Sequence, residues 1–240
     1  MLPICLMLGA CMPGASGDVP SRAAVNPAST MPSMKVFSGS RPSTPARSNS
    51  DIARDFLDLS MQLESGRELP VLSRFETPIT VTVTGQPSAT LQSDLARLLH
   101  RLRTEAGINI TQVKGPANIT IEAVSGAEIR RHLPQAACFV VPNISRLSEY
   151  KSAKRSRSIF IPNDTSPQEV RDCLHEELAQ ALGPLNDLYR LPDSVFNDDN
   201  VHTVLTGFDM LVLQAYYAPE LHSGMSRRAV ASQLPAILTR

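Results

Sequence analysis

The amino-acid sequence predicts an α+β fold, in which helices pack against a single sheet of strands. Two patterns carry this prediction: short segments of alternating, β-branched residues typical of strands, and longer segments with apolar residues at helical spacing. They follow one another in the order helix, strand, long helix, several strands and helix. Of the 240 residues, 42% are hydrophobic, which suits a packed core, and the formal net charge is zero. A neutral chain gives no indication of a nucleic-acid partner, and we expect none.

The first elements are expected after residue 50. In residues 51–64, DIARDFLDLSMQLE, apolar side chains recur at helical spacing, and Asp51 is a suitable cap. Residues 77–85 alternate as in a strand, and a long helix is expected over 90–105, ending at Gly107. The polar face of that helix holds Arg97, His100, Arg101 and Arg103. We expect this basic face to be solvated rather than to form a binding patch.

The second half alternates strands with a loop and then reaches a well-delimited helix. Strands are expected at residues 108–113, 117–124, 138–142 and 158–164, with a basic loop at 151–158. Ser166 followed by Pro167 is a typical helix start, and Gly183 is a typical stop, so a helix is expected to run to about Leu182.

The N-terminal segment resembles that of bacterial lipoproteins. Residues 1–11, MLPICLMLGAC, are apolar and end in a Leu-Gly-Ala-Cys sequence that resembles the lipobox, whose cysteine receives the lipid. The resemblance implies a periplasmic lipoprotein of the cell envelope, joined to the membrane through Cys11. Met12 stands where an Asp would retain it at the inner membrane, which favours the outer membrane. No Lys or Arg precedes the short apolar run, so an uncleaved apolar N-terminus or a start further upstream is the alternative.

Residues 12–50 are rich in Ser, Pro, Ala and Gly and show no apolar periodicity. Such a segment buries too little apolar surface to offset its ordering entropy, so we expect a disordered tether. As a lipoprotein, the chain would lose Cys5 with its signal and carry lipid on Cys11. Cys138 and Cys173 would then remain as a pair in an oxidising compartment, and we expect them to form a structural disulfide. Two buried thiols in a cytosolic protein are the alternative.

Residues 173–187, CLHEELAQALGPLND, contain the most informative motif of the chain. A zinc-peptidase helix places two His ligands four residues apart, with the general-base Glu directly after the first. In the register that begins at His175, the second ligand position is Ala179, which has no ligand atom. That register fails as a metal site.

A register shifted by one residue fits a longer pattern, H-E-x-x-H-x-x-G-x-x-H. Glu176, Gln180 and Asn186 then take the three ligand positions, Glu177 takes the general-base position, and Gly183 keeps its place. In this register the sequence resembles the metzincin peptidases, the matrixins especially. His175 lies about 100° around the helix from the first ligand position, so it is no simple substitute.

The resemblance extends over residues 75 to 220. Phe196 or Val195 stands where metzincins place a Met in a tight turn below the metal, and residues 205–219 resemble the closing helix of matrixins. It implies a metzincin-like domain with a mixed, twisted sheet, a long packing helix, an active-site-type helix and a C-terminal helix. We place this domain at residues 51–225 and a C-terminal tail at 226–240.

A narrower resemblance is to the bacterial family named domain of unknown function 2927. The residues that carry it are Glu176 through Asp187, the triplet Phe196-Asn197-Asp198, and Leu205 through Asp209. The family is one of secreted or lipoprotein-like proteins, and the likeness therefore agrees with the N-terminal segment. It does not by itself imply an activity.

One Glu and two side-chain amides are poor zinc ligands, so we expect no zinc and no ordinary zinc peptidase. His202 and His222 stand at no spacing that would complete a zinc site. The favoured interpretation is a non-catalytic envelope protein that binds a peptide or protein partner and has no cofactor. Glu176, Gln180 and Asn186 would then be hydrogen-bonded to each other. Their neighbours would be His175, Asp187 and Phe196.

Two enzymatic alternatives stay open. Glu176, Glu177, Gln180, Asn186 and Asp187 offer only oxygen ligands, which suit Ca²⁺, Mg²⁺ or Mn²⁺, with residues 197–200 as further donors or simply a solvated turn. The other alternative is a hydrolase without metal, in which a buried Glu acts as general acid.

Overall fold

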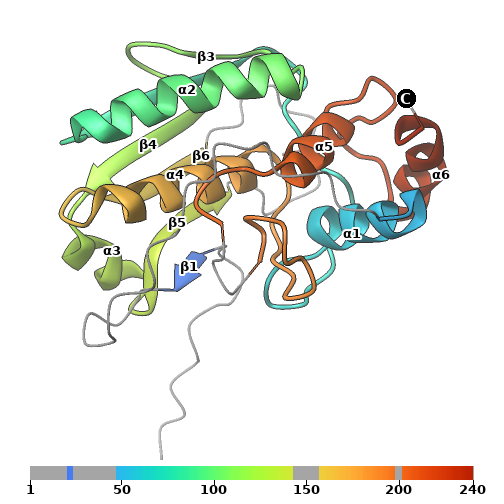
Figure 1. The fold of residues 1–240 in the computed structure, drawn as a ribbon, viewed down its shortest axis with the longest axis horizontal. Coiled ribbons are helices and arrows are strands. Elements are labelled where there is room, and N and C mark those ends of the chain that lie inside the picture. Colours follow the sequence, from blue (N-terminus) through green and yellow to red (C-terminus); the bar gives the residue numbers. More distant parts are fainter. Residues whose placement is uncertain (1–20, 24–46, 143–156, 198–201, 240) are drawn as a thin grey trace, which may run out of the picture.

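The computed structural model describes residues 21–23, 47–142, 157–197 and 202–239 of the chain (Figure 1). The predicted signal segment with Cys11 lies outside these residues. The strands are β1 (Ser21–Ala23), β2 (Ile79–Gly85), β3 (Ile110–Gln112), β4 (Ile119–Val124), β5 (Ala136–Pro142) and β6 (Arg157–Pro162). The helices are α1 (Asn49–Met61), α2 (Ala89–Glu105), α3 (Gly126–His132), α4 (Pro167–Leu182), α5 (Gly207–Tyr216) and α6 (Arg227–Ile237).

The six strands form one mixed sheet in the order β1-β5-β6-β4-β2-β3. Strands β3, β2, β4 and β6 run parallel, with Val81 opposite Ile119 and Ile119 opposite Arg157. Strand β5 runs antiparallel to β6, and β1 runs antiparallel to β5 at the sheet edge. The predicted α+β fold with a mixed sheet is confirmed.

The alternation of apolar and polar residues along the strands decides which face of the sheet is buried. Ile119, Ile121 and Ala123 of β4 point into the main core, which they share with the leucines of α2 and with Leu174 and Leu178 of α4. The opposite face has a smaller apolar cluster under α3, where the rings of Phe139 and Phe160 stack with centroids 4.6 Å apart. Helices α2 and α4 therefore cover one face, and α3 covers part of the other (Figure 1).

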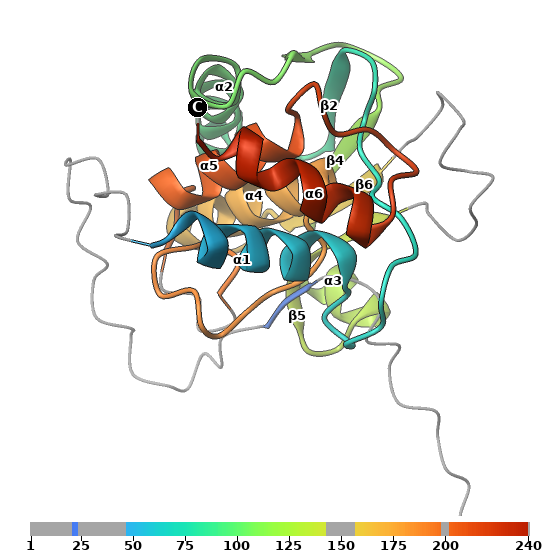
Figure 2. The same cartoon turned by 90° about the vertical axis from the view of Figure 1, so that its right-hand side faces the viewer.

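Helices α1, α5 and α6 lie together beside α4, with α1 and α6 next to each other (Figure 2). Phe56 of α1, Tyr216 of α5 and Leu234 of α6 are all buried in the main core. The domain therefore has one continuous core that runs from the sheet through α4 to these three helices.

A network of ion pairs also joins α1 to the rest of the domain. Asp58 on α1 contacts Arg190 and Arg227, each at 2.6 Å. Asp55 on the same helix contacts Arg190 at 2.9 Å and Arg47 at 3.2 Å. The network connects α1 to α6 and to the segment after α4.

The ends of the domain contain elements that were not predicted from the sequence. Ser21–Ala23 form strand β1, although they lie within the predicted tether, and the predicted tail folds into α6, whose Val230 and Leu234 are buried. The cap of α1 is Ser48 rather than Asp51. Helix α3 was not predicted. Within the described ranges, we find no helix with the length and apolar character needed to cross a membrane.

Candidate functional site

Helix α4 carries the candidate site, and its local sequence fixes both of its ends. The Ser166 side chain accepts a hydrogen bond from the Glu169 N–H at 3.2 Å, Pro167 occupies the first turn, and Gly183 ends the helix. Every residue from Asp172 to Leu182 is buried. Helix α4 packs against β5, β6 and α2, so the polar side chains of its buried residues need partners inside the protein.

Gly183 is required by close packing. A Cβ atom built on it would lie 2.2 Å from ring carbons of Tyr216, which is too close for any side chain. The Tyr216 ring is fully buried, and its hydroxyl donates to the Ser73 carbonyl at 2.9 Å. The glycine of the motif therefore lets α5 pack directly on the end of α4.

His175 is buried and neutral. Its Nδ1 accepts a hydrogen bond from the Leu205 N–H at 3.0 Å, which holds the segment leading into α5. Burial, reinforced by the nearby charges of Arg101, Arg171 and Arg97, lowers the pKa of His175 to about 3. His175 therefore acts as a structural acceptor at neutral pH.

Gln180 is fully buried and faces Asp187. Its Nε2 lies 3.3 Å and 3.4 Å from the two carboxylate oxygens of Asp187. Its Oε1 is buried and has no hydrogen-bond partner among the described residues. The side chain at the second ligand position, Gln180, is therefore hydrogen-bonded to the carboxylate of Asp187, seven residues further along the chain.

Asn186 bonds to a different partner from Gln180. Its Nδ2 donates to the Asp58 carbonyl of α1 at 3.0 Å. The predicted hydrogen bond between the two amides is replaced by two separate contacts, one to Asp187 and one to α1. Asn186 thus fixes the segment after α4 to the first helix of the domain.

Glu176 and Glu177 are both buried, with exposed fractions of 5% and 0%. They are neighbours on α4, so their side chains leave the helix about 100° apart. The general-base position of the pattern is therefore closed to solvent.

Arg157, at the start of β6, is a site residue that the sequence analysis missed. The sequence places it in a basic loop, but its side chain is only 1% exposed. Its Nη1 donates to the Gln180 carbonyl at 3.0 Å, and its guanidinium lies 5.5 Å from the centre of the Phe75 ring. A positive charge at the C-terminal end of α4 is favourable because the helix dipole is negative there. A run of basic residues, read alone, gives no indication that one of them is buried.

Residues 188–197, which follow α4 in the chain, fold into a turn. Phe196 is fully buried, and its carbonyl accepts from the Leu188 N–H at 2.9 Å. The Asn197 amide donates to the Leu191 carbonyl at 2.9 Å and closes the same turn. Residues 198–200, the rest of the NDDN segment, lie outside the described residues.

Asp209 joins this turn to α5. Its carboxylate accepts from the Thr206 N–H at 2.7 Å, from the Val195 N–H at 3.2 Å and from the Ser194 hydroxyl. Complete burial raises the pKa of Asp209, although these hydrogen bonds oppose the shift. The role of Asp209 is thus to cap α5 and position residues 194–195.

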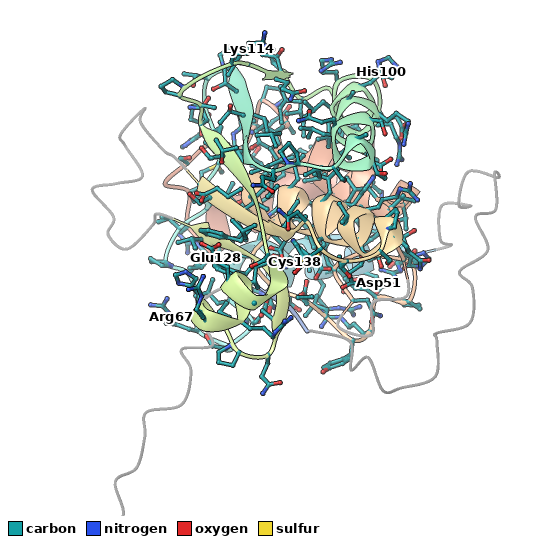
Figure 3. All side chains as sticks on the ribbon, turned by 90° about the vertical axis from the view of Figure 1, so that its left-hand side faces the viewer. Asp51, Arg67, His100, Lys114, Glu128 and Cys138 are labelled. Atoms are coloured by element: carbon teal, nitrogen blue, oxygen red, sulfur yellow. A yellow bond between two sulfur atoms is a disulfide. The ribbon has the colours of Figure 1, made fainter. Side chains whose placement is uncertain are left out.

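Cys138 of β5 and Cys173 of α4 form a disulfide, as predicted. Both side chains are fully buried (Cys138 is labelled in Figure 3). The bond attaches the site helix to the sheet three residues before Glu176.

The family model described as "Protein of unknown function (DUF2927)" matches residues 49–236. The chain belongs to this family. The match extends from the start of α1 to the last turn of α6, so α6 is part of the DUF2927 domain. A search of curated proteins gave no significant match.

Solved structures of myroilysin, a metzincin-type metallopeptidase, resemble this DUF2927 chain weakly. One is 17% identical, covers 58% of this chain and 58% of its own, and has a TM-score of 0.32. Another is 15% identical, covers 62% and 61%, and has a TM-score of 0.31. The DUF2927 chain thus spans about three fifths of the myroilysin chains. Similarity at this level carries no conclusion about activity.

The ligand positions of this DUF2927 chain do not suit the zinc ion that the metzincin pattern implies. They supply one carboxylate and two amides, and the amides of Gln180 and Asn186 turn to different partners. Zinc sites in enzymes use three protein ligands, mainly imidazole, converging on one point. Across the part of the chain that the structure describes, no three His, Cys, Asp or Glu side chains converge as a metal site would require.

A surface hollow of about 250 Å³ lies outside the motif, at the start of β2. It is lined by Arg74–Ile79, Ile108, Asn109 and Tyr217. The Arg74 guanidinium is already bound to the carbonyls of Tyr216 and Ala218, each at 2.9 Å. None of the predicted site residues lines this hollow.

Proposed function

We propose that this DUF2927 protein is a non-catalytic envelope lipoprotein that binds an extended peptide segment of a partner. The observation that carries the proposal is the hydrogen bonding of the two amides at the former ligand positions. Gln180 binds Asp187, and Asn186 binds the backbone of α1, so both stabilise the fold. A site used for hydrolysis also has to admit water, whereas Glu177 is fully buried.

The disulfide supports an oxidising compartment, since such bonds are rare in the reducing cytosol. The envelope location and the lipid on Cys11 rest on the N-terminal sequence. Metabolic labelling with a fatty acid tests them: the wild-type chain is expected to carry label and to fractionate with membranes, and Cys11→Ser is expected to do neither. A labelled Cys11→Ser protein would contradict this part of the proposal.

Metal content is the first test of the non-catalytic role. The full chain is produced in an oxidising compartment, purified without chelator and measured by elemental mass spectrometry. We expect no stoichiometric metal in the folded protein. Near-stoichiometric zinc would overturn the argument from the ligand positions and make a peptidase the leading function.

Glu177→Gln is the second test, because it removes the carboxylate and keeps the shape of the side chain. We expect the wild type to show no hydrolysis of peptide or ester substrates, and the variant to bind partners as the wild type does. Glu68→Gln, an exposed position, is the matched control. A hydrolytic activity that is lost in folded Glu177→Gln and kept in Glu68→Gln would overturn the proposal.

A second candidate function, a hydrolase with an oxygen-ligand metal, has one observation in its favour. The buried Oε1 of Gln180 has no hydrogen-bond partner among the described residues, and the Asp187 carboxylate is next to the same amide. An oxygen acceptor beside a carboxylate suits Ca²⁺ or Mn²⁺. Stoichiometric calcium or manganese in the wild type, lost in Gln180→Leu but kept in the control Gln92→Leu, would establish this candidate.

A further inference from the structure

The edge of the sheet next to the site helix is covered by the N-terminal segment of the same chain. Strand β1 pairs antiparallel with β5, with Ser21 opposite Phe139, Arg22 opposite Cys138 and Ala23 opposite Ala136 (Figure 1). Strand β5 has β6 on its other side, so β1 alone completes its pairing. The contact joins parts of the chain that are far apart in sequence.

The pairing is of a kind that another strand can replace. Strand β1 has three residues, and its register shifts between Arg22 and Ala23. It belongs to a Pro- and Ser-rich stretch whose composition does not favour a stable strand. The β5 strand beneath it has seven residues and is held by β6 and by the disulfide of Cys138. Strand β5 is therefore held firmly in the sheet, whereas β1, which covers its edge, is short.

An uncovered β5 would present a row of backbone N–H and C=O groups to solvent, which is the template for strand addition. It lies close to the site helix, because Cys138, opposite Arg22, is bonded to Cys173 of α4.

We propose that β1 is an intramolecular cover over a strand-addition site on β5, and that an extended peptide segment of a partner binds there by displacing β1. The proposal rests on the peptide-binding function proposed above and names its surface. The ligand is an extended backbone with N–H groups available on alternate residues, pairing antiparallel with residues 136–139.

The cover weakens binding by a calculable factor. A segment linked to its own site acts at an effective concentration on the order of 1 mM. If the isolated segment has a dissociation constant of about 0.1 mM, the site is covered about ten to one, and an outside peptide binds about tenfold more weakly than to an uncovered site.

The experiment compares the full-length wild type with Ser21→Pro/Arg22→Pro. Neighbouring residues of a strand direct their N–H groups to opposite sides, so two successive prolines remove a donor toward β5 whichever residue supplies it. Ser21→Ala/Arg22→Ala keeps both N–H groups and is the matched control. The probe is a fluorescent peptide with the sequence of residues 18–26, DVPSRAAVN, measured by anisotropy. A second peptide, with proline at the Ser21 and Arg22 positions, serves as the non-pairing probe.

We expect the first peptide to bind the proline variant at least about tenfold more tightly than the wild type or the alanine variant. The non-pairing peptide is expected to bind none of them. Amide hydrogen exchange of residues 136–140 is expected to be slow in the wild type, faster in the proline variant, and slow again when the first peptide is added.

Equal peptide affinity and equal exchange in the wild type and the proline variant would show that β1 is no cover. Faster exchange without peptide binding would show that the edge accepts no added strand, while leaving a partner site elsewhere on the domain untouched. A wild-type dimer that dissociates in the proline variant would show that β1 covers a second copy rather than its own chain.

Discussion

His175 couples the pH of the solution to the stability of the fold. Its pKa is lowered from 6.5 to about 3 in the folded protein, so between these values the unfolded chain binds the additional proton. The free energy of unfolding therefore falls as pH is lowered through this window, with a limiting slope of about 1.4 kcal/mol per pH unit.

His175→Asn keeps an acceptor close to the Nδ1 position and removes the titration. We expect its free energy of unfolding to depend less on pH than that of the wild type between pH 6.5 and 5, as measured by urea unfolding. His100→Asn, at an exposed position on α2, is the control and is expected to keep the wild-type slope (Figure 3). Identical slopes for His175→Asn and the wild type would contradict the buried neutral state.

Gly183→Ala tests the packing of α5 on the end of α4. The new Cβ atom would overlap the Tyr216 ring, and we expect a loss of about 3 kcal/mol in the free energy of unfolding. Gly66→Ala is the matched control, since its Cβ would meet no atom within 4 Å and only the positive φ of 77° is unfavourable. That control is expected to lose about 1 kcal/mol. Equal losses would mean that contact with the Tyr216 ring does not select glycine at residue 183.

At the scale of residues, the sequence predicts where the motif lies but not the hydrogen-bond partners of its side chains. Glu176 and Gln180 lie on α4 and Asn186 lies on the segment after it, and Gln180 and Asn186 bond to different partners. Spacing along a helix could not predict that Asn186 turns to α1, because that contact depends on a helix over a hundred residues earlier. The burial of Arg157 could not be predicted either, because its contacts are with Gln180 and Phe75, which are distant in sequence.

At the scale of elements, a disulfide links strand β5 covalently to helix α4. It joins residues 35 positions apart. Closing a loop of that size lowers the entropy of the unfolded chain, which raises the free energy of unfolding by about 4 kcal/mol. We expect Cys138→Ala/Cys173→Ala to unfold at lower denaturant concentration by a corresponding amount. Reductant is expected to destabilise the wild type and leave the double variant unchanged. A reductant effect of the same size in both would point to a cause other than this bond.

Elements with clear boundary residues or clear alternation were predicted well, whereas α3 and α6 were missed although Ser125 and Ser226 cap them. Helix α4 has Ser166, Pro167 and Gly183 at its ends, and β2 and β4 alternate clearly. Helix α6 contains Pro235 and has only two buried residues, so its sequence did not distinguish it from a tail. Strand β1 exists only through its pairing with β5, a long-range contact that no local pattern contains.

For the whole molecule, the ion pairs of Asp58 hold α1 against α6 and the segment after α4. Partial burial by itself would raise the pKa of Asp58, but the hydrogen bonds and charges of Arg227 and Arg190 together outweigh it and lower the pKa. A carboxyl group with a lowered pKa stabilises the fold above its unfolded-state value, and this contribution is lost as pH falls through the folded-state value.

Asp58→Asn is therefore expected to reduce the free energy of unfolding at pH 7 by about 1 kcal/mol at low salt, and by less in 1 M NaCl. Asp51→Asn, whose partner Arg54 is exposed, is the comparison and is expected to change the free energy of unfolding much less than Asp58→Asn does. A loss at Asp58 that is independent of salt would indicate packing or hydrogen bonding instead of charge.

The strand order of the sheet also has a consequence for biosynthesis. Strand β6 is inserted between β4 and β5, so β5 is made before the strand that joins it to the rest of the sheet. A nascent chain that ends before residue 157 can pair β5 only with β1, and an isolated two-strand ribbon is marginally stable in water. Strand β5 can therefore join β4 and the rest of the sheet only once residues 157–162 have emerged. Chains stalled before that point are expected to be the protease-sensitive ones.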